Sequence, residues 1–226
     1  MLINFILYNS YALGLIFITD KVLCFIINDK ARWFQLHFSA NMLITYLTYN
    51  NVINIVNFPQ NSSLALTDSE NFAGSMALSI HIYHCLFFPL TNIDLIHHIS
   101  SVFLSIHINL IYNVKTLHMF YFFLTGLPGG LDYLFLTLYK NNQIHYLTQK
   151  NFSSKQNIFI RIPGGIICCY LMYYSTHFIH SLPELICAYL MIIIIFLNVT
   201  MFGKMAIENY AIRKYQYEIE GNTRFN

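Results

Sequence analysis

The sequence contains very little charge for its length. Of its 226 residues, 12 are Lys or Arg and 10 are Asp or Glu, so charged residues make up 10% of the chain. An ordinary soluble domain carries about 25% charged residues. Hydrophobic residues make up 56%, and the mean hydropathy is +0.51. Because so few charges cannot cover a water-facing surface, the composition excludes an ordinary soluble domain.

Three further absences narrow the class of protein. The net charge of +2 gives no basic field, so no nucleic-acid partner is expected. No CxxC spacing is present, and the first residues lack the positive charges of a cleaved signal peptide. We expect all the cysteines to be reduced packing residues: Cys24, Cys85, Cys168, Cys169 and Cys187. With 20 Phe and 17 Tyr the chain is not disordered, which leaves an integral membrane protein.

Several apolar stretches are long enough to cross a bilayer of about 30 Å, which takes about 20 helical residues. They lie near 4–27, 33–56, 73–91, 94–113, 117–139, 157–180 and 184–203. We therefore predict an all-α, polytopic transmembrane bundle of about seven spans with a six-helix core. The expected divisions are an N-terminal span (1–29), a transmembrane domain (30–215) and a cytosolic C-terminal tail (216–226).

Basic residues are distributed unevenly between the predicted loops. If the N-terminus is non-cytosolic, the cytosolic segments are 28–32, 92–93, 140–156 and the C-terminal tail. These segments and the adjoining helix ends hold 11 of the 12 basic residues, with only Lys115 on the other side. The positive-inside rule expects this asymmetry, so we predict a non-cytosolic N-terminus and a cytosolic C-terminus. If the first stretch does not span, six helices with the same C-terminal orientation remain.

Polar residues within the apolar stretches are candidates for function, because burying them in a membrane costs free energy. At about 1.5 Å per helical residue, polar residues from six helices are expected about 6–12 Å beneath the cytosolic face. They are His37, His84, His97, His98, Asp132, Arg161 and Asn198. The sequence thus predicts one thin polar layer near that face.

The most concentrated group in this layer is an acid with a histidine pair. Asp94 precedes His97 by three residues and His98 by four, so all three share one helix face. The carboxylate can fix the tautomer of an imidazole and make its other nitrogen a better base. The short connection 91–93 makes neighbours of the two flanking spans, which allows His84 to approach the pair. Two Pro-Gly-Gly strings, 128–130 and 163–165, should kink or closely pack their spans.

The string Asp94-Leu95-Ile96-His97-His98-Ile99-Ser100-Ser101 resembles the TLC family of membrane proteins, which includes the ceramide synthases. The resemblance covers about residues 30–215. It implies a lipid-acting protein of the endoplasmic reticulum or another internal membrane, with no cofactor and with acyl-CoA as co-substrate for acylation of a lipid amine. The implied catalytic residues are Asp94, His97, His98 and Asp132, with His84, Arg161 and Asn198 binding substrate. Ceramide synthases also carry a His-Asp pair, a further Asp and a Glu in the next span, and here only Asp132 matches.

Other readings of the same residues remain open. Many TLC proteins are not enzymes, so a non-catalytic lipid-handling or trafficking protein is one alternative. A metal-dependent hydrolase or hydroxylase is less favoured, because the spacing of His81, His84, His97 and His98 supplies too few ligands and the last span has no histidine pair. A channel is also less favoured, because the ionisable residues gather at one depth rather than along a path.

Overall fold

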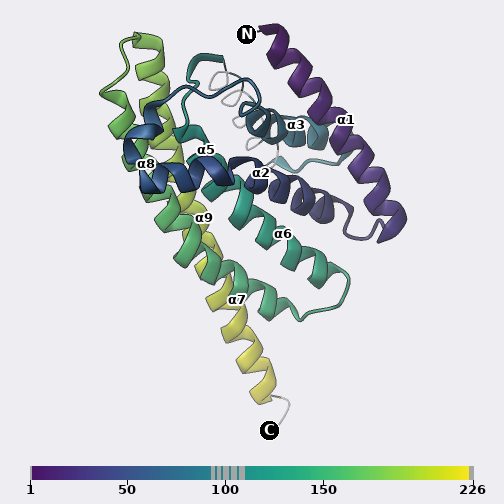
Figure 1. Ribbon diagram of the computed structural model, residues 1–226. Helices are drawn as coiled ribbons and strands as arrows, with labels where there is room; N and C mark the ends of the chain where they lie inside the picture. The colour runs from purple at the N-terminus through teal and green to yellow at the C-terminus, as the bar shows by residue number, and fades with distance from the viewer. Residues whose placement is uncertain are drawn as a thin grey trace.

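The computed structural model describes residues 2–92, 95, 98, 102, 106 and 110–223, and this part of the chain is almost entirely helical (Figure 1). The α-helices are α1 (Leu2–Ile26), α2 (Arg32–Asn57), α3 (Phe72–Phe87), α5 (Thr116–Phe120), α6 (Leu127–Lys140), α7 (Tyr146–Gln156), α8 (Ile162–Thr176) and α9 (Leu182–Thr223). A 3-10 helix, η1 (Pro59–Ser63), and two π-helices, η2 (Tyr121–Gly126) and η3 (Asn157–Arg161), connect them. The predicted all-α class is confirmed for these residues.

Four helical segments are long and apolar enough to cross a membrane: Ile3–Ile26, Thr116–Lys140, Tyr146–Thr176 and Leu182–Ile219. They coincide with four of the predicted spans. The stretch 33–56 is helical in α2 but less apolar, and α3 is a shorter apolar helix of 16 residues. Most of the predicted span 94–113 lies outside the described residues. The four segments are those expected of an integral membrane protein, while seven spans stay a prediction.

Helix α2 runs through the middle of the bundle (Figure 1). It contacts α1, α3, α5, α6, η1 and η2, so much of its surface faces protein. That position explains its low hydropathy, because polar side chains are tolerated in a bundle where other helices surround them. The buried polar residues of α2 are Gln35, His37, Asn41, Thr48 and Asn51.

Both Pro-Gly-Gly strings follow a π-helical turn directly. Proline has no N–H to donate to the carbonyl four residues before it, and a wider turn accommodates the loss. The glycines allow close helix contact: a Cβ on Gly129 would lie 2.8 Å from Asn41 Nδ2, and one on Gly164 would lie 2.3 Å from Phe123 Cδ1. The predicted tight packing at these strings is therefore confirmed.

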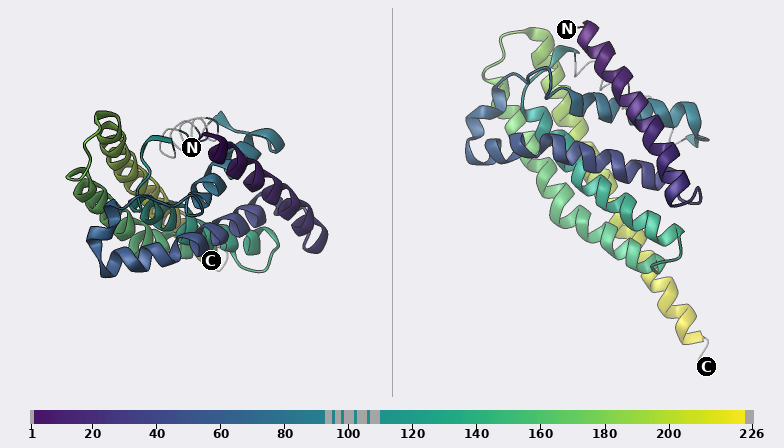
Figure 2. Two further views of the ribbon diagram at one scale, coloured as in Figure 1. Left: turned by 45° about the horizontal axis from the view of Figure 1, so that its top comes forward. Right: turned by 45° about the vertical axis from the view of Figure 1, so that its right-hand side comes forward.

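One predicted loop is helical, and the last predicted span lies within a longer helix. The segment 140–156, expected to be a loop, contains α7, which continues through η3 into α8. The last span, expected at 184–203, belongs to the 42-residue α9, which projects beyond the bundle toward the C-terminus (Figure 2). Two ion pairs on α9, Lys204–Glu208 (3.6 Å) and Lys214–Glu218 (3.8 Å), each join residues one helical turn apart. They stabilise the polar C-terminal part of this helix. All five cysteines are free, as predicted.

Candidate functional site

Three buried histidines from different segments lie together inside the bundle. His37 comes from α2, His84 from α3 and His98 from the segment that follows α3. The ring centroids of His84 and His98 are 4.4 Å apart, and those of His37 and His84 are 6.3 Å apart. His98 is 3% exposed and also approaches His81, with centroids 5.2 Å apart. The predicted approach of His84 to the histidine pair is therefore confirmed for His98.

Aromatic rings join these histidines into one unit. Trp33, the only tryptophan in the chain, has its ring centroid 3.6 Å from that of His37 and 3.5 Å from that of His84. Tyr133 of α6 stacks on His37, with centroids 4.4 Å apart and planes 27° apart. We call His37, His84, His98, Trp33 and Tyr133 the histidine–aromatic cluster. Sequence reasoning missed Trp33, although its spacing of four from His37 places both rings on one face of α2.

An ion pair with a buried carboxylate borders this cluster. Asp20 of α1 is 1% exposed, and its carboxylate accepts hydrogen bonds from Arg32 Nε (2.8 Å) and Tyr83 Oη (2.8 Å). The Arg32 guanidinium lies 4.7 Å from the ring centroid of Phe88, which in turn lies 4.9 Å from that of Trp33. These hydrogen bonds join α1 to α2 and α3, and the positive charge of Arg32 neutralises that of Asp20 next to the aromatic rings. Sequence reasoning missed it because its members lie in different helices; the short 27–31 connection was the available signal.

The remaining predicted site residues that the structure describes are Asp132 of α6, Arg161 of η3 and Asn198 of α9. Asp132 Oδ1 accepts a hydrogen bond from Gln149 Nε2 of α7 (3.4 Å), and the Asp132 carboxylate interacts electrostatically with the positive charge of Arg161. Asn198 lies on α9, with its Oδ1 buried and without a hydrogen-bond partner among the described residues. Asp132 is connected to the histidine–aromatic cluster through its neighbour Tyr133. The predicted residues Asp94 and His97 lie outside the described residues.

Arg161 has a definite structural contact. Its Nη2 donates a hydrogen bond to the Leu124 carbonyl at 2.8 Å. Leu124 stands four residues before Pro128, which has no N–H to offer that carbonyl in the usual helical pattern. Arg161 itself stands two residues before Pro163. One side chain therefore connects the two Pro-Gly-Gly interruptions.

A different polar network lies at the C-terminal end of α2, which is the end far from the histidine–aromatic cluster. Asn51 Nδ2 contacts Glu70 Oε1 (2.6 Å) and His118 Nδ1 (3.0 Å), and His118 Nε2 lies 3.0 Å from the Glu70 carbonyl. These contacts assign the proton of His118 to Nε2, so that Nδ1 accepts from the amide. Lys115 Nζ lies 3.4 Å from Glu70 Oε1. We call Asn51, Glu70, Lys115 and His118 the Glu70 network.

The Glu70 carboxylate stays charged in this network. Burial alone would raise its pKa, but hydrogen bonds from Thr67 and Asn51 and the charge of Lys115 outweigh burial and lower the pKa to about 2. The Thr67 backbone N–H donates to Oε2 at 2.7 Å. Fully satisfied carboxylates of this kind hold loops in place.

The two regions differ in the chemistry that they allow. No group of three or more His, Cys, Asp or Glu side chains suited to a metal ion occurs among the residues that the structure describes. The imidazoles of the histidine–aromatic cluster are groups of the kind that act as general acids or bases, and they are almost completely buried.

Comparisons of this chain with known protein families, with curated proteins and with solved structures found no match.

Proposed function

We propose that the chain is a multi-pass membrane protein that transfers an acyl group from acyl-CoA to a lipid amine. The observation that carries this proposal is the position of His98, whose buried ring lies 4.4 Å from that of His84 in a bundle with four apolar helices. Ionisable side chains kept inside such a bundle mark functional sites by default. The reaction class comes from the resemblance of residues 94–101 to the TLC family.

In the proposed reaction, the lipid amine nitrogen attacks the thioester carbonyl carbon. An N–C bond forms, the C–S bond breaks, and coenzyme A leaves as its thiolate. His97 or His98 removes the proton from the attacking nitrogen and returns it to the departing sulfur. In a covalent variant of the reaction, the imidazole nitrogen attacks the thioester first and coenzyme A leaves; the lipid amine then attacks the acyl-imidazole, which frees the histidine. Asp94 fixes the tautomer of the pair, and Asp132 positions the amine. His84, Arg161 and Asn198 contribute to substrate binding.

The proposal includes a topology. Seven spans, a non-cytosolic N-terminus and a cytosolic C-terminus place the histidine pair near the cytosol, where acyl-CoA is available. The uneven distribution of basic residues supports this orientation, and an internal membrane such as the endoplasmic reticulum would contain the lipid amine.

A second candidate function is lipid handling without a reaction. The observation that favours it is the close packing of Trp33 against both His37 and His84, with ring centroids 3.6 Å and 3.5 Å apart. Rings packed so closely contribute to stability, and a site that only holds a lipid or assists membrane-protein traffic needs no proton transfer.

Expression in acyltransferase-deficient cells, followed by lipid profiling, tests the proposal. Wild type should produce an N-acylated lipid, and His97→Ala or His98→Ala should lower its amount about 100-fold. His177→Ala provides the matched control, because His177 is exposed at the end of α8 and lies outside the cluster. If wild type and all three variants leave the lipids unchanged, the non-catalytic function is the correct one.

A further inference from the structure

The C-terminal half of α9 lies outside the membrane. At about 1.5 Å per residue, this 42-residue helix is about 63 Å long, whereas a bilayer core of about 30 Å takes only about 20 helical residues. The stretch 185–203 carries no Lys, Arg, Asp or Glu, and six charged residues follow between Lys204 and Glu220. The membrane segment therefore ends near Lys204, and the rest of α9 extends out of the membrane and past the end of the bundle (Figure 2).

One face of this extension is apolar although it lies in water. Its large apolar side chains are 44–65% exposed, namely Met205, Ile212, Tyr215 and Ile219. Together with Glu208 they follow one another in alternating steps of three and four residues, which is the spacing of the a and d positions of a coiled coil. We call these five residues the α9 seam. Seams of this kind are normally covered by another helix.

The opposite face of α9 packs on the rest of the chain. Gly203 is buried against α8, where a Cβ on it would lie 2.7 Å from Ile162 Cδ1. Seven residues later Tyr210 is half-buried, and after seven more the ring centroid of Tyr217 lies 5.6 Å from that of His145. The a positions of the seam follow this row by two residues, or about 200° around the helix. The α9 seam thus points away from the bundle, and among the described residues nothing covers it.

We infer that the α9 seam pairs with the same seam of a second copy of this chain, in a short parallel two-stranded coiled coil. Copies of a membrane protein share one orientation, so their α9 extensions leave the membrane in the same direction and identical residues meet along the seam. Residues 205–223 make fewer than three heptads, which is marginal for helices free in solution. Confinement of both copies to one membrane raises their effective concentration and compensates for the short length. This pairing needs no reaction at the histidine–aromatic cluster.

The charges along the seam are compatible with pairing of like with like. Glu208 is the only charged residue in the seam, and Lys204 Nζ of the same helix lies 3.6 Å from its Oε1. A single polar residue at such a position fixes the register of the two strands at a cost in stability. The flanking positions that approach each other across a parallel pair place Lys204 near Asn209 and Ala211 near Gln216, so no like charges meet there.

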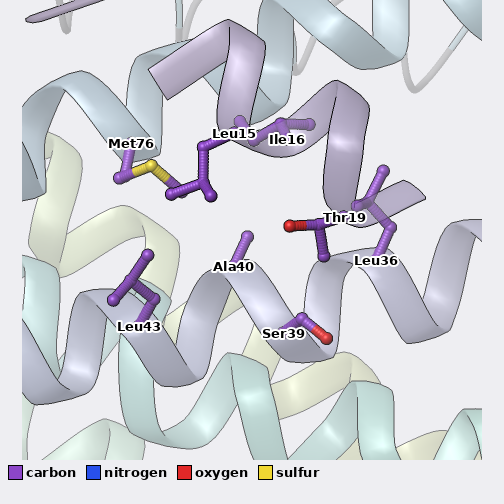
Figure 3. A pocket seen from close by; sticks show the side chains of 8 residues that line it. All are labelled: Leu15, Ile16, Thr19, Leu36, Ser39, Ala40, Leu43 and Met76. Carbon is purple, nitrogen blue, oxygen red and sulfur yellow. The ribbon is translucent and has the colours of Figure 1, made fainter. Parts of the chain in front are cut away.

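Two other ways of covering the seam do not fit the structure. The bilayer surface cannot cover it, because α9 is one continuous helix that carries the seam away from the membrane. The cavity between α1 and α2 cannot receive the α9 of another copy (Figure 3). Its volume is about 70 Å³, whereas a helix with its side chains is about 10 Å across.

Single-molecule photobleaching tests the inference. The full chain, with one dye at its C-terminus, is reconstituted into phosphatidylcholine vesicles, and the bleaching steps count the copies that stay together as more lipid is added. Wild type should form dimers. Ile212→Glu and Ile219→Glu should each lower the association constant at least about ten-fold, because they bury a charge in the seam. The matched control is Ile207→Glu, the same exchange outside the seam on the same helix, which should change the constant less than about two-fold.

Two further variants keep the test decisive if Ile212→Glu does not fold. Glu208→Leu removes the only charge from the seam and should raise the association constant at least about five-fold. Oxidation of Ile212→Cys should give a disulfide-linked dimer, whereas Arg213→Cys, on the neighbouring face, should give no more than the wild type with its own free cysteines.

Two results would overturn the inference. Wild-type chains that stay single at every lipid ratio would leave a different protein as the occupant of the seam. Dimers that respond to none of the seam variants would assign the contact between copies to another surface.

Discussion

The two ends of α2 use histidine in opposite ways. At the far end, His118 has both ring nitrogens in hydrogen bonds, one with Asn51 and one with the Glu70 carbonyl. At the near end, the rings of His37 and His84 both pack against Trp33, and the ring of His84 lies edge-on to that of His98. Both sets are buried, so burial does not distinguish them.

This difference separates a structural histidine from a candidate for chemistry. The contacts of His118 are made within the Glu70 network, which ties the loop before α3 to α2 and α5. The imidazoles of the histidine–aromatic cluster instead pack against Trp33, Tyr133 and one another, and an imidazole can accept or release a proton near neutral pH. Removing hydrogen-bonding groups should therefore cost stability at the far end of α2 and function at the near end.

The largest effect is expected for Asn51→Leu. The substitution removes the amide shared by Glu70 and His118, leaving a charged oxygen and a buried ring nitrogen without that donor. The free energy of unfolding should fall by about 3 kcal/mol. Denaturant unfolding in detergent micelles, followed by helical circular dichroism, measures it. Asn50→Leu, on the exposed side of the same turn, should change it by less than about 0.5 kcal/mol.

Acid should weaken the far end of α2 by a smaller amount. The pKa of Glu70 is about 2 in the folded chain against 4.5 ordinarily, so its contribution is fully present above about pH 5 and is lost as the pH falls toward 2. Because Glu70 is partly exposed, we expect a loss of about 1–2 kcal/mol. Unfolding measured between pH 6 and 2 should show this loss in wild type but not in Glu70→Gln. The same slope in both proteins would assign the loss to other carboxylates.

The smallest effect on stability is expected for His84→Phe. Phenylalanine keeps an aromatic ring against Trp33, so the free energy of unfolding should change by less than about 1 kcal/mol. Under the proposed function, the acylated lipid should nevertheless decrease. His118→Phe, which preserves a ring but breaks two hydrogen bonds, should show the reverse pattern. Similar unfolding changes for the two variants would remove the distinction between the ends of α2.

The sequence predicted the features that depend on local pattern. The apolar stretches predicted the helical class and four membrane-crossing candidates, and the short connection expected at 91–93 correctly predicted that His84 lies near His98. The Pro-Gly-Gly strings marked the close contacts of α6 and α8. In each case, spacing along one chain segment was enough to fix the geometry.

Features set by tertiary contacts were not predictable in the same way. Helix α7 is polar and shows no apolar face, so its helical structure comes from packing against α6 and α9 rather than from its own pattern. In the sequence, Asp20 is an unfavourable charge within an apolar span. The structure explains it, because Arg32 and Tyr83 both donate hydrogen bonds to its carboxylate. The low hydropathy of α2 likewise makes sense only once its central position is known.

The contact between Arg161 and the Leu124 carbonyl has a mechanical consequence. A broken helix usually acts as a hinge of its own, but here the guanidinium from one break closes the gap left by the proline of the other. The hydrogen bond couples the two helix interruptions, so that a change in the bend of one helix is transmitted to the other. Any movement that separates the two interruptions has to break this hydrogen bond.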